Sequence, residues 1–150
     1  ELIHERVKCL TGWLLTCMKD LRHRNGKPLV KIYGPSDTKQ RGGAVTVNFF
    51  NPEGMVIDHR WIEEKANARN ISLRTGCFCN PGAGELALHI SSEELSSCFN
   101  RPDHEQRLTY DEFRLCLNTK ASGAVRISVG LVSNFADGQR LLDFLATLVE

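Results

Sequence analysis

The residues best suited to chemistry lie together in one segment, residues 74–84, which reads RTGCFCNPGAG. Two cysteines, Cys77 and Cys79, stand two residues apart there, among three glycines and a proline. Glycine and proline shape loops, and loops on a rigid scaffold often carry reactive groups. A cysteine acts as a nucleophile through its thiolate, which neighbouring guanidinium groups favour. The segment therefore predicts a nucleophilic cysteine, and we expect only one of the two thiols to face a substrate.

Two arginines could supply the guanidinium groups. Arg74 opens the segment, and Arg126 lies in the middle of the alternating stretch AVRISV, residues 124–129. An arginine at the centre of a strand near the core is costly unless it binds an anion, so we expect Arg126 to hold a negatively charged group. An ordinary salt-bridged arginine is the alternative interpretation.

Other interpretations of the cysteine pair stay open at this point. The two thiols could be inert structural groups, or they could form half of a metal site. His89 and Cys98 would be the nearest further ligands, but no second pair of cysteines or histidines stands at zinc-ligand spacing. We therefore predict no metal site in this chain.

Apolar periodicity and capping signals predict the elements that must position the loop. Three- and four-residue spacing predicts a helix over residues 1–24 and another running on from Phe135. Capping residues predict shorter helices that begin after Asp58, Ser91 and Thr109, and residues 100–103 read as a polar turn. Four β-rich runs predict strands near residues 28–33, 44–50, 71–74 and 124–129. This pattern predicts an α+β fold, with a small, mostly antiparallel sheet covered by helices on one face.

Composition limits the classes of protein to consider. The chain has 150 residues, enough for a single domain, and a formal net charge of +1, so nothing favours nucleic acid or an anionic membrane as a partner. No apolar run reaches the length of a membrane span. Six cysteines without a secretory signal suggest a reducing, cytoplasmic setting. We expect the four cysteines outside the loop to be reduced and buried, namely Cys9, Cys17, Cys98 and Cys116.

The sequence resembles a known family in several places. RTGCFCNPGA closely resembles the active-cysteine loop of molybdenum cofactor sulfurases, which belong to the class V aminotransferase and cysteine desulfurase superfamily. The stretch from Arg41-Gly42-Gly43 into AVTVNFF is similar to the entry of that family's small domain, and GAVRISVGLVSNFADGQRLLDF to its closing strand and helix. ERVKCLTGWLL resembles the long helix that links the family's two domains.

The resemblance implies a place in a larger enzyme. Residues 1–150 would be one unit, the C-terminal small domain of a type I pyridoxal-phosphate transferase, with residues 1–24 as the interdomain helix and residues 28–150 as the small domain proper. Pyridoxal phosphate would be held by a lysine of the missing large domain, so we expect no cofactor bound to this chain and no activity from it alone. The parent enzyme is expected to be a homodimer.

The resemblance also implies a mechanism and its residues. The parent would take sulfur from L-cysteine as an enzyme persulfide, with Cys79 as the nucleophile and Cys77 as the alternate. Arg126 would bind the substrate carboxylate, and Arg74 would support the loop or the substrate. The family often carries a third cysteine directly after NPGA, where this chain has Gly84. The sulfur acceptor therefore stays open. Two alternative functions also stay open: a class V aminotransferase or lyase without persulfide chemistry, and a non-enzymatic sulfur-carrier or binding module.

Overall fold

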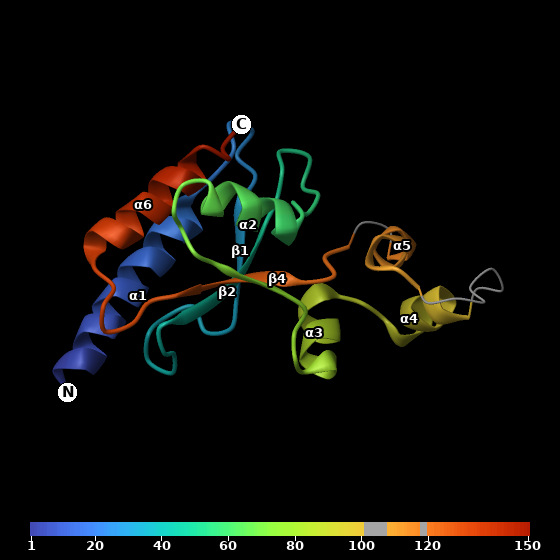
Figure 1. The fold of residues 1–150 in the computed structure, drawn as a ribbon, viewed down its shortest axis with the longest axis horizontal. Coiled ribbons are helices and arrows are strands. Elements are labelled where there is room, and N and C mark those ends of the chain that lie inside the picture. The colour runs from blue at the N-terminus through green and yellow to red at the C-terminus, as the bar shows by residue number, and fades with distance from the viewer. Residues whose placement is uncertain (101–107, 118–119) are drawn as a thin grey trace.

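Residues 1–100, 108–117 and 120–150 are described by a computed structural model, whose helices and strands are shown in Figure 1. The elements in chain order are α1 (Leu2–Asp20), β1 (Val30–Tyr33), β2 (Ala44–Phe49), α2 (His59–Asn67), β3 (Arg74–Gly76), α3 (Pro81–Leu88), α4 (Ser92–Phe99), α5 (Tyr110–Cys116), β4 (Ala124–Ser128) and α6 (Phe135–Ala146). The polar turn expected at residues 100–103 falls largely outside the described residues.

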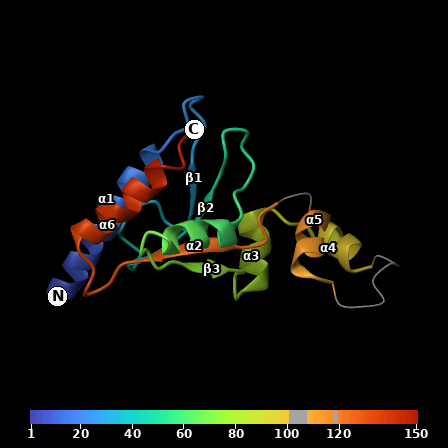
Figure 2. The same ribbon diagram turned by 45° about the horizontal axis from the view of Figure 1, so that its top comes forward.

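The four strands form one antiparallel sheet in the order β1-β2-β4-β3. Helices α1 and α6 lie side by side, and with α2 they cover one face of the sheet (Figures 1 and 2). Alternation along each strand sends one set of side chains into the core that these helices close. That set includes Val45, Val47, Phe49, Val125 and Ile127, each at most 4% exposed. The predicted α+β class is confirmed.

The two terminal helices approach each other closely at a glycine. A methyl group added to Gly138 would lie 2.5 Å from the Trp13 ring, so only glycine allows this spacing. The Trp13 ring also meets Phe135 edge-on, with the ring centroids 5.1 Å apart. The residues just before α6 fix where this helix begins, since Asn134 caps α6 in a capping box with Asp137.

The first helix is shorter than predicted. It ends at Asp20, and residues 21–24 are not helical. The amide of Leu29 donates to the carbonyl of Leu21, and Arg22 pairs with Pro28 in a β-bridge. Backbone pairing with a later segment therefore ends the helix about one turn before the predicted end at residue 24.

The predicted strand at 71–74 is displaced along the chain. Strand β3 begins only at Arg74 and runs to Gly76. The amide of Ile71 instead bonds to the carbonyl of Ala66 at the end of α2, so this residue still belongs to the turn after the helix. The loop is also shorter than expected, because α3 already begins at Pro81, after the N-cap Asn80.

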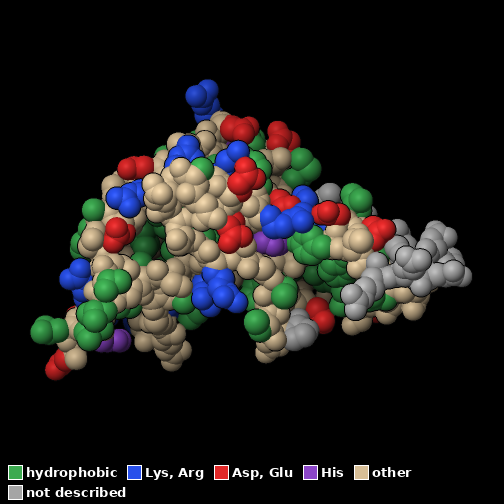
Figure 3. Space-filling view, in the orientation of Figure 1, with side chains coloured by type: hydrophobic (Ala, Val, Ile, Leu, Met, Phe, Trp, Pro, Cys, Tyr) green, Lys and Arg blue, Asp and Glu red, His purple; other side chains and the backbone are tan. Residues whose placement is uncertain are grey.

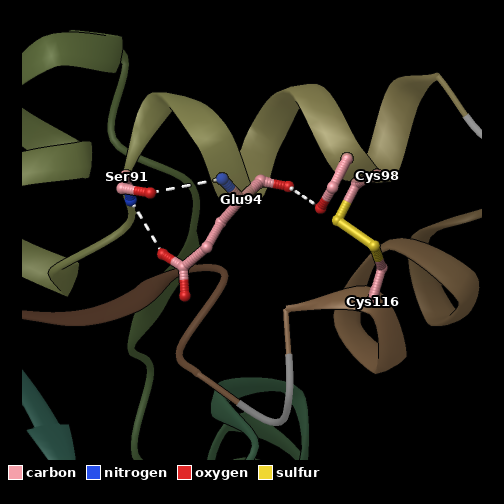
Figure 4. The surroundings of a disulfide bond; sticks show 5 residues. Ser91, Glu94, Cys98 and Cys116 are labelled. Atoms are coloured by element: carbon pink, nitrogen blue, oxygen red, sulfur yellow. Dashed lines mark hydrogen bonds between the residues drawn. A yellow bond between two sulfur atoms is a disulfide. The ribbon is translucent and has the colours of Figure 1, made fainter.

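Helices α4 and α5 form a small lobe that projects from the sheet (Figures 1 and 2). The predicted helix starts at Ser91 and Thr109 are confirmed. Both are capping boxes, with Glu94 and Glu112 as the reciprocal partners. A disulfide joins Cys98 to Cys116 across the lobe (Figure 4), so the expectation that these two thiols are reduced was wrong. Two short helices bury little apolar surface, and a covalent link can replace part of that packing. The other four cysteines are free, and Cys9 is exposed, so the expectation that Cys9 is buried was wrong.

Polar contacts hold the lobe against α2. Asp58, the N-cap of α2, accepts a hydrogen bond from Arg114 of α5 at 2.8 Å, and Arg60 bonds Asp111 at 2.8 Å. The hydroxyl groups of Tyr110 and Ser122 lie 2.5 Å apart. Figure 3 shows basic, acidic and histidine side chains together where α2 meets the lobe. Asp58 thus serves both the start of a helix and the docking of another.

Candidate functional site

A row of four residues crosses the sheet on the face opposite the core. Tyr33 pairs with Thr46, Thr46 with Arg126, and Arg126 with Arg74, one residue from each strand. Arg126 and Arg74 are both exposed. The expectation that Arg126 lies near the core is therefore wrong for its side chain. Period-two alternation turns it away from Val125 and Ile127 and onto the open face.

The two arginines have no protein counter-ion in the part of the chain that the structure describes. No salt bridge or hydrogen bond links either guanidinium to another described residue. Like charges directly opposite each other on a sheet repel, which costs stability. Two cations held together in this way form a suitable site for an anion such as a carboxylate.

A pocket of about 300 Å³ brings the arginines together with the cysteine loop. Its lining consists of Thr46, Arg74, Thr75, Gly76, Cys77, Phe78, Cys79, Ala124 and Arg126. All four residues predicted for the site are therefore in one place. In the space-filling view, a hollow with basic side chains beside it separates the sheet from α3 (Figure 3).

The loop between β3 and α3 is anchored through its aromatic residue. Phe78 is partly buried and meets the ring of Tyr33 edge-on, at 6.0 Å between centroids. The same side chain lies against Gly84 of α3, where an added methyl group would come within 3.1 Å of it. Burial beside these groups raises the pKa of Tyr33. Phe78 therefore fixes the loop on the open face of the sheet.

Both thiols, and not just one, face the pocket. Cys77 and Cys79 are exposed and line it together, on either side of the anchored Phe78. This differs from our expectation that only one of the two thiols would face a substrate. The geometry therefore offers two nucleophiles to one bound molecule.

Glycines and polar contacts shape the start of the loop. Gly76 has φ +132°, which L side chains rarely adopt. A methyl group on Gly123 would lie 2.7 Å from the Gly76 carbonyl oxygen, so β3 and the start of β4 can approach only with glycine there. The Thr75 hydroxyl donates to Glu63 of α2 at 2.6 Å, which ties the core side of β3 to the helix layer.

The metal alternative finds no support among the described residues. No group of three or more potential ligands is arranged to hold an ion within residues 1–100, 108–117 and 120–150. Cys98 is bonded to Cys116, and the His89 ring lies 3.3 Å from the Lys31 ammonium.

In the same ranges, no helix is long and apolar enough to cross a membrane.

Sequence reasoning missed three residues of the site. Thr46 and Tyr33 lie in β-rich runs where nothing marks them as functional. Only the strand register places Thr46 beside Arg126 and Tyr33 beside Thr46. Phe78 lies between the two cysteines, and this position was the one signal in the sequence that could have identified it as a site residue. A residue that separates two reactive groups in a loop is placed to orient both.

Fold and site together define a class: an α+β domain whose open sheet face presents two arginines and two free cysteines to a common pocket. Comparison with known proteins finds several relatives that share one name. The chain is 38% identical over 130 residues to a molybdenum cofactor sulfurase of Bombyx mori, and 35% identical over 132 residues to one of Arabidopsis thaliana. A molybdenum cofactor sulfurase of Bos taurus is 33% identical over 150 residues.

These matches cover 84%, 85% and 97% of this chain but only 15%, 16% and 16% of the relatives. The chain is therefore similar to one segment of molybdenum cofactor sulfurases, and it spans about a sixth of the length of the curated relatives it matches. No protein-family model matches the chain.

Proposed function

We propose that this chain is the sulfur-accepting small domain of a pyridoxal-phosphate enzyme that takes sulfur from L-cysteine as a persulfide on Cys79. One observation carries the proposal: two exposed thiols and two exposed, unpaired guanidinium groups line the same pocket. The relatives are named as sulfurases, which agrees with a sulfur-moving parent.

The arginines bind the carboxylate of L-cysteine. Arg126 lies at the centre of the row, between Thr46 and Arg74, and supplies a planar group that can donate two hydrogen bonds to a carboxylate. Arg74 adds a second positive charge from the neighbouring strand. The bound anion is attracted to both guanidinium groups, and it also relieves the repulsion between them. Both effects favour binding.

Cys79 accepts the sulfur. Its thiolate attacks the sulfur atom of the bound L-cysteine, a new S–S bond forms, and the substrate's C–S bond breaks with a proton added to carbon. The products are alanine and a Cys79 persulfide, so every atom of the substrate is accounted for. The attacking group must be an accessible thiolate, and Cys79 is exposed on the pocket.

The residues of this pocket are suited to binding the substrate and not to holding the cofactor covalently. No lysine is among its lining residues in the described part of the chain. We therefore place the cofactor lysine in the rest of the full-length protein, which is also the partner of this domain. Pyridoxal phosphate bound there would supply the electron sink that makes the substrate's C–S bond cleavable.

The test is L-cysteine turnover by the full-length protein. We expect alanine to form from L-cysteine with the wild-type protein and no alanine to form with Cys79→Ser. Cys9→Ser is the matched control, because Cys9 is an exposed free thiol outside the pocket. Alanine formation that survives Cys79→Ser would overturn the role of Cys79 and favour an aminotransferase or lyase without persulfide chemistry.

A further inference from the structure

The proposed function uses one thiol of the pocket and leaves the other without a role. Cys77, like Cys79, is an exposed free thiol that lines the pocket. Phe78, which lies between them and lines the same pocket, holds the loop through its contacts with Tyr33 and Gly84. The two cysteines therefore line one pocket from a short segment that Phe78 holds in place.

Their spacing suits a disulfide. Two residues of extended chain rise about 6.6 Å between Cα atoms, at about 3.3 Å each. Cysteines form disulfides when their Cα atoms lie within about 4.4–6.8 Å and their side chains converge. A slight bend of the loop at Cys79, where the chain already turns toward α3, shortens the span further.

We propose that Cys77 is a resolving thiol that releases the sulfur of the Cys79 persulfide as hydrogen sulfide. This step rests on the proposed function, since it needs a persulfide on Cys79. The Cys77 thiolate attacks the Sγ atom of Cys79. A Cys77–Cys79 disulfide forms, the bond from Cys79 Sγ to the outer sulfur breaks, and that sulfur leaves as hydrosulfide, which takes a proton from water.

The electrons balance within the loop. The outer sulfur gains two electrons and becomes sulfide, while the two thiols lose two electrons and become a disulfide. A thiol reductant such as dithiothreitol returns the loop to its dithiol form. The persulfide thus has two competing fates, transfer to an acceptor or release as sulfide with closure of the loop. The closed loop blocks further turnover until it is reduced.

The resolving step can be tested without L-cysteine. Inorganic polysulfide, added to the full-length protein, loads free thiols with one extra sulfur. Cleavage after Arg74 and after Glu85 then yields the peptide 75–85, in which Cys77 and Cys79 are the only cysteines. Mass spectrometry of this peptide distinguishes an added sulfur atom from the loss of two hydrogen atoms.

With wild-type protein, we expect the peptide to lose two hydrogen atoms, and dithiothreitol to reverse the loss. With Cys77→Ser, the peptide should keep the added sulfur on Cys79. Cys9→Ser should behave as wild type. A wild-type peptide that keeps the added sulfur, or a Cys77→Ser peptide that loses it as fast as wild type loses its own, would overturn the proposal.

A second arm uses L-cysteine with the full-length protein and no acceptor. We expect Cys77→Ser to release less sulfide for each alanine that it forms than wild type does. If wild-type protein makes no alanine, the proposed function fails, while the polysulfide experiment still decides the role of Cys77. Sulfide release by Cys77→Ser at the wild-type rate would overturn the resolving role alone.

Discussion

Arg74 and Arg126 are direct partners across the β3–β4 pair, with their Cα atoms in register on the open face of the sheet. Both are exposed, and neither has an acidic partner among the residues that the structure describes. A pair of like charges in this position stabilises nothing in the isolated domain. We infer that the arginine pair binds an anion, and that the repulsion between the two side chains lowers the stability of the domain.

Replacing one arginine should therefore stabilise the chain while it weakens the site. For Arg126→Gln, we expect the free energy of unfolding in low salt to rise by about 0.2–1 kcal/mol, the range for cross-strand charge pairs. Denaturant unfolding at low and high salt measures this, and salt should shrink the difference by screening. In the full-length protein the same change should weaken L-cysteine binding by about 1.5–3 kcal/mol. An Arg126→Gln chain that is less stable than wild type in low salt would speak against the repulsion.

Two adjacent glycines provide a matched pair for testing the entry to β2. A methyl group on Gly43 would lie 2.1 Å from the carbonyl oxygen of Val129, whereas one on Gly42 would meet nothing within 4 Å. We expect Gly43→Ala to lower the free energy of unfolding by about 2–3 kcal/mol, since backbone must move to make room. Gly42→Ala should leave it within about 0.5 kcal/mol of wild type. Equal stability of the two variants would contradict this packing.

Asp58 should be the residue on which docking of the α4–α5 lobe depends. Asp58→Ala removes both the cap of α2 and the partner of Arg114, and we expect it to cost about 1–3 kcal/mol of unfolding free energy. Asp58→Asn is the control that keeps a capping oxygen and loses the charge. It should cost less, while amide hydrogen exchange in α5 still becomes faster. Unchanged exchange in α5 for both variants would mean that other contacts hold the lobe.

The His59 side chain should make stability depend on pH. Burial lowers the pKa of His59 below its ordinary value of 6.5, although the Asp58 carboxylate opposes the shift. The unfolded chain therefore binds a proton at a higher pH than the folded chain does. The neutral His59 ring therefore contributes its full stabilisation of the fold above about pH 6.5. This contribution is lost as the pH falls through the pKa of the folded chain.

Denaturant unfolding between about pH 7.5 and pH 5.5 should show the free energy of unfolding decreasing toward acid. His59→Gln should remove part of that slope, because glutamine does not titrate. His4→Gln, at an exposed position in α1, should leave the slope as it is. A His59→Gln chain with the wild-type slope would show that the burial of this ring has no such effect.

Local signals in the sequence predicted local structure well. The capping boxes at Ser91 and Thr109 and the cap at Asp58 involve residues within a single turn, so neighbouring residues suffice to specify them. The four strands were found because β-branched runs mark them, with a shift at β3, where the turn after α2 takes up Ile71.

Features that depend on distant contacts could not be predicted in the same way. Helix α1 ends early because Leu21 pairs with Leu29, and Cys98 meets Cys116 only once two helices are placed against each other. For the site, Cys77, Cys79, Arg74 and Arg126 were all identified from residue type and context. Thr46 and Tyr33 join them only through the register of the sheet.

Sulfur transfer to Cys79 is tested most directly by mass spectrometry of the peptide 75–85 after L-cysteine is added to the full-length protein. The Cys77→Ser background is used, because it keeps the persulfide from being resolved. We expect one added sulfur atom on Cys79 in that background, and none when Cys79 is changed to Ser as well. A peptide 75–85 without added sulfur, from a protein that converts L-cysteine to alanine, would contradict the role of Cys79.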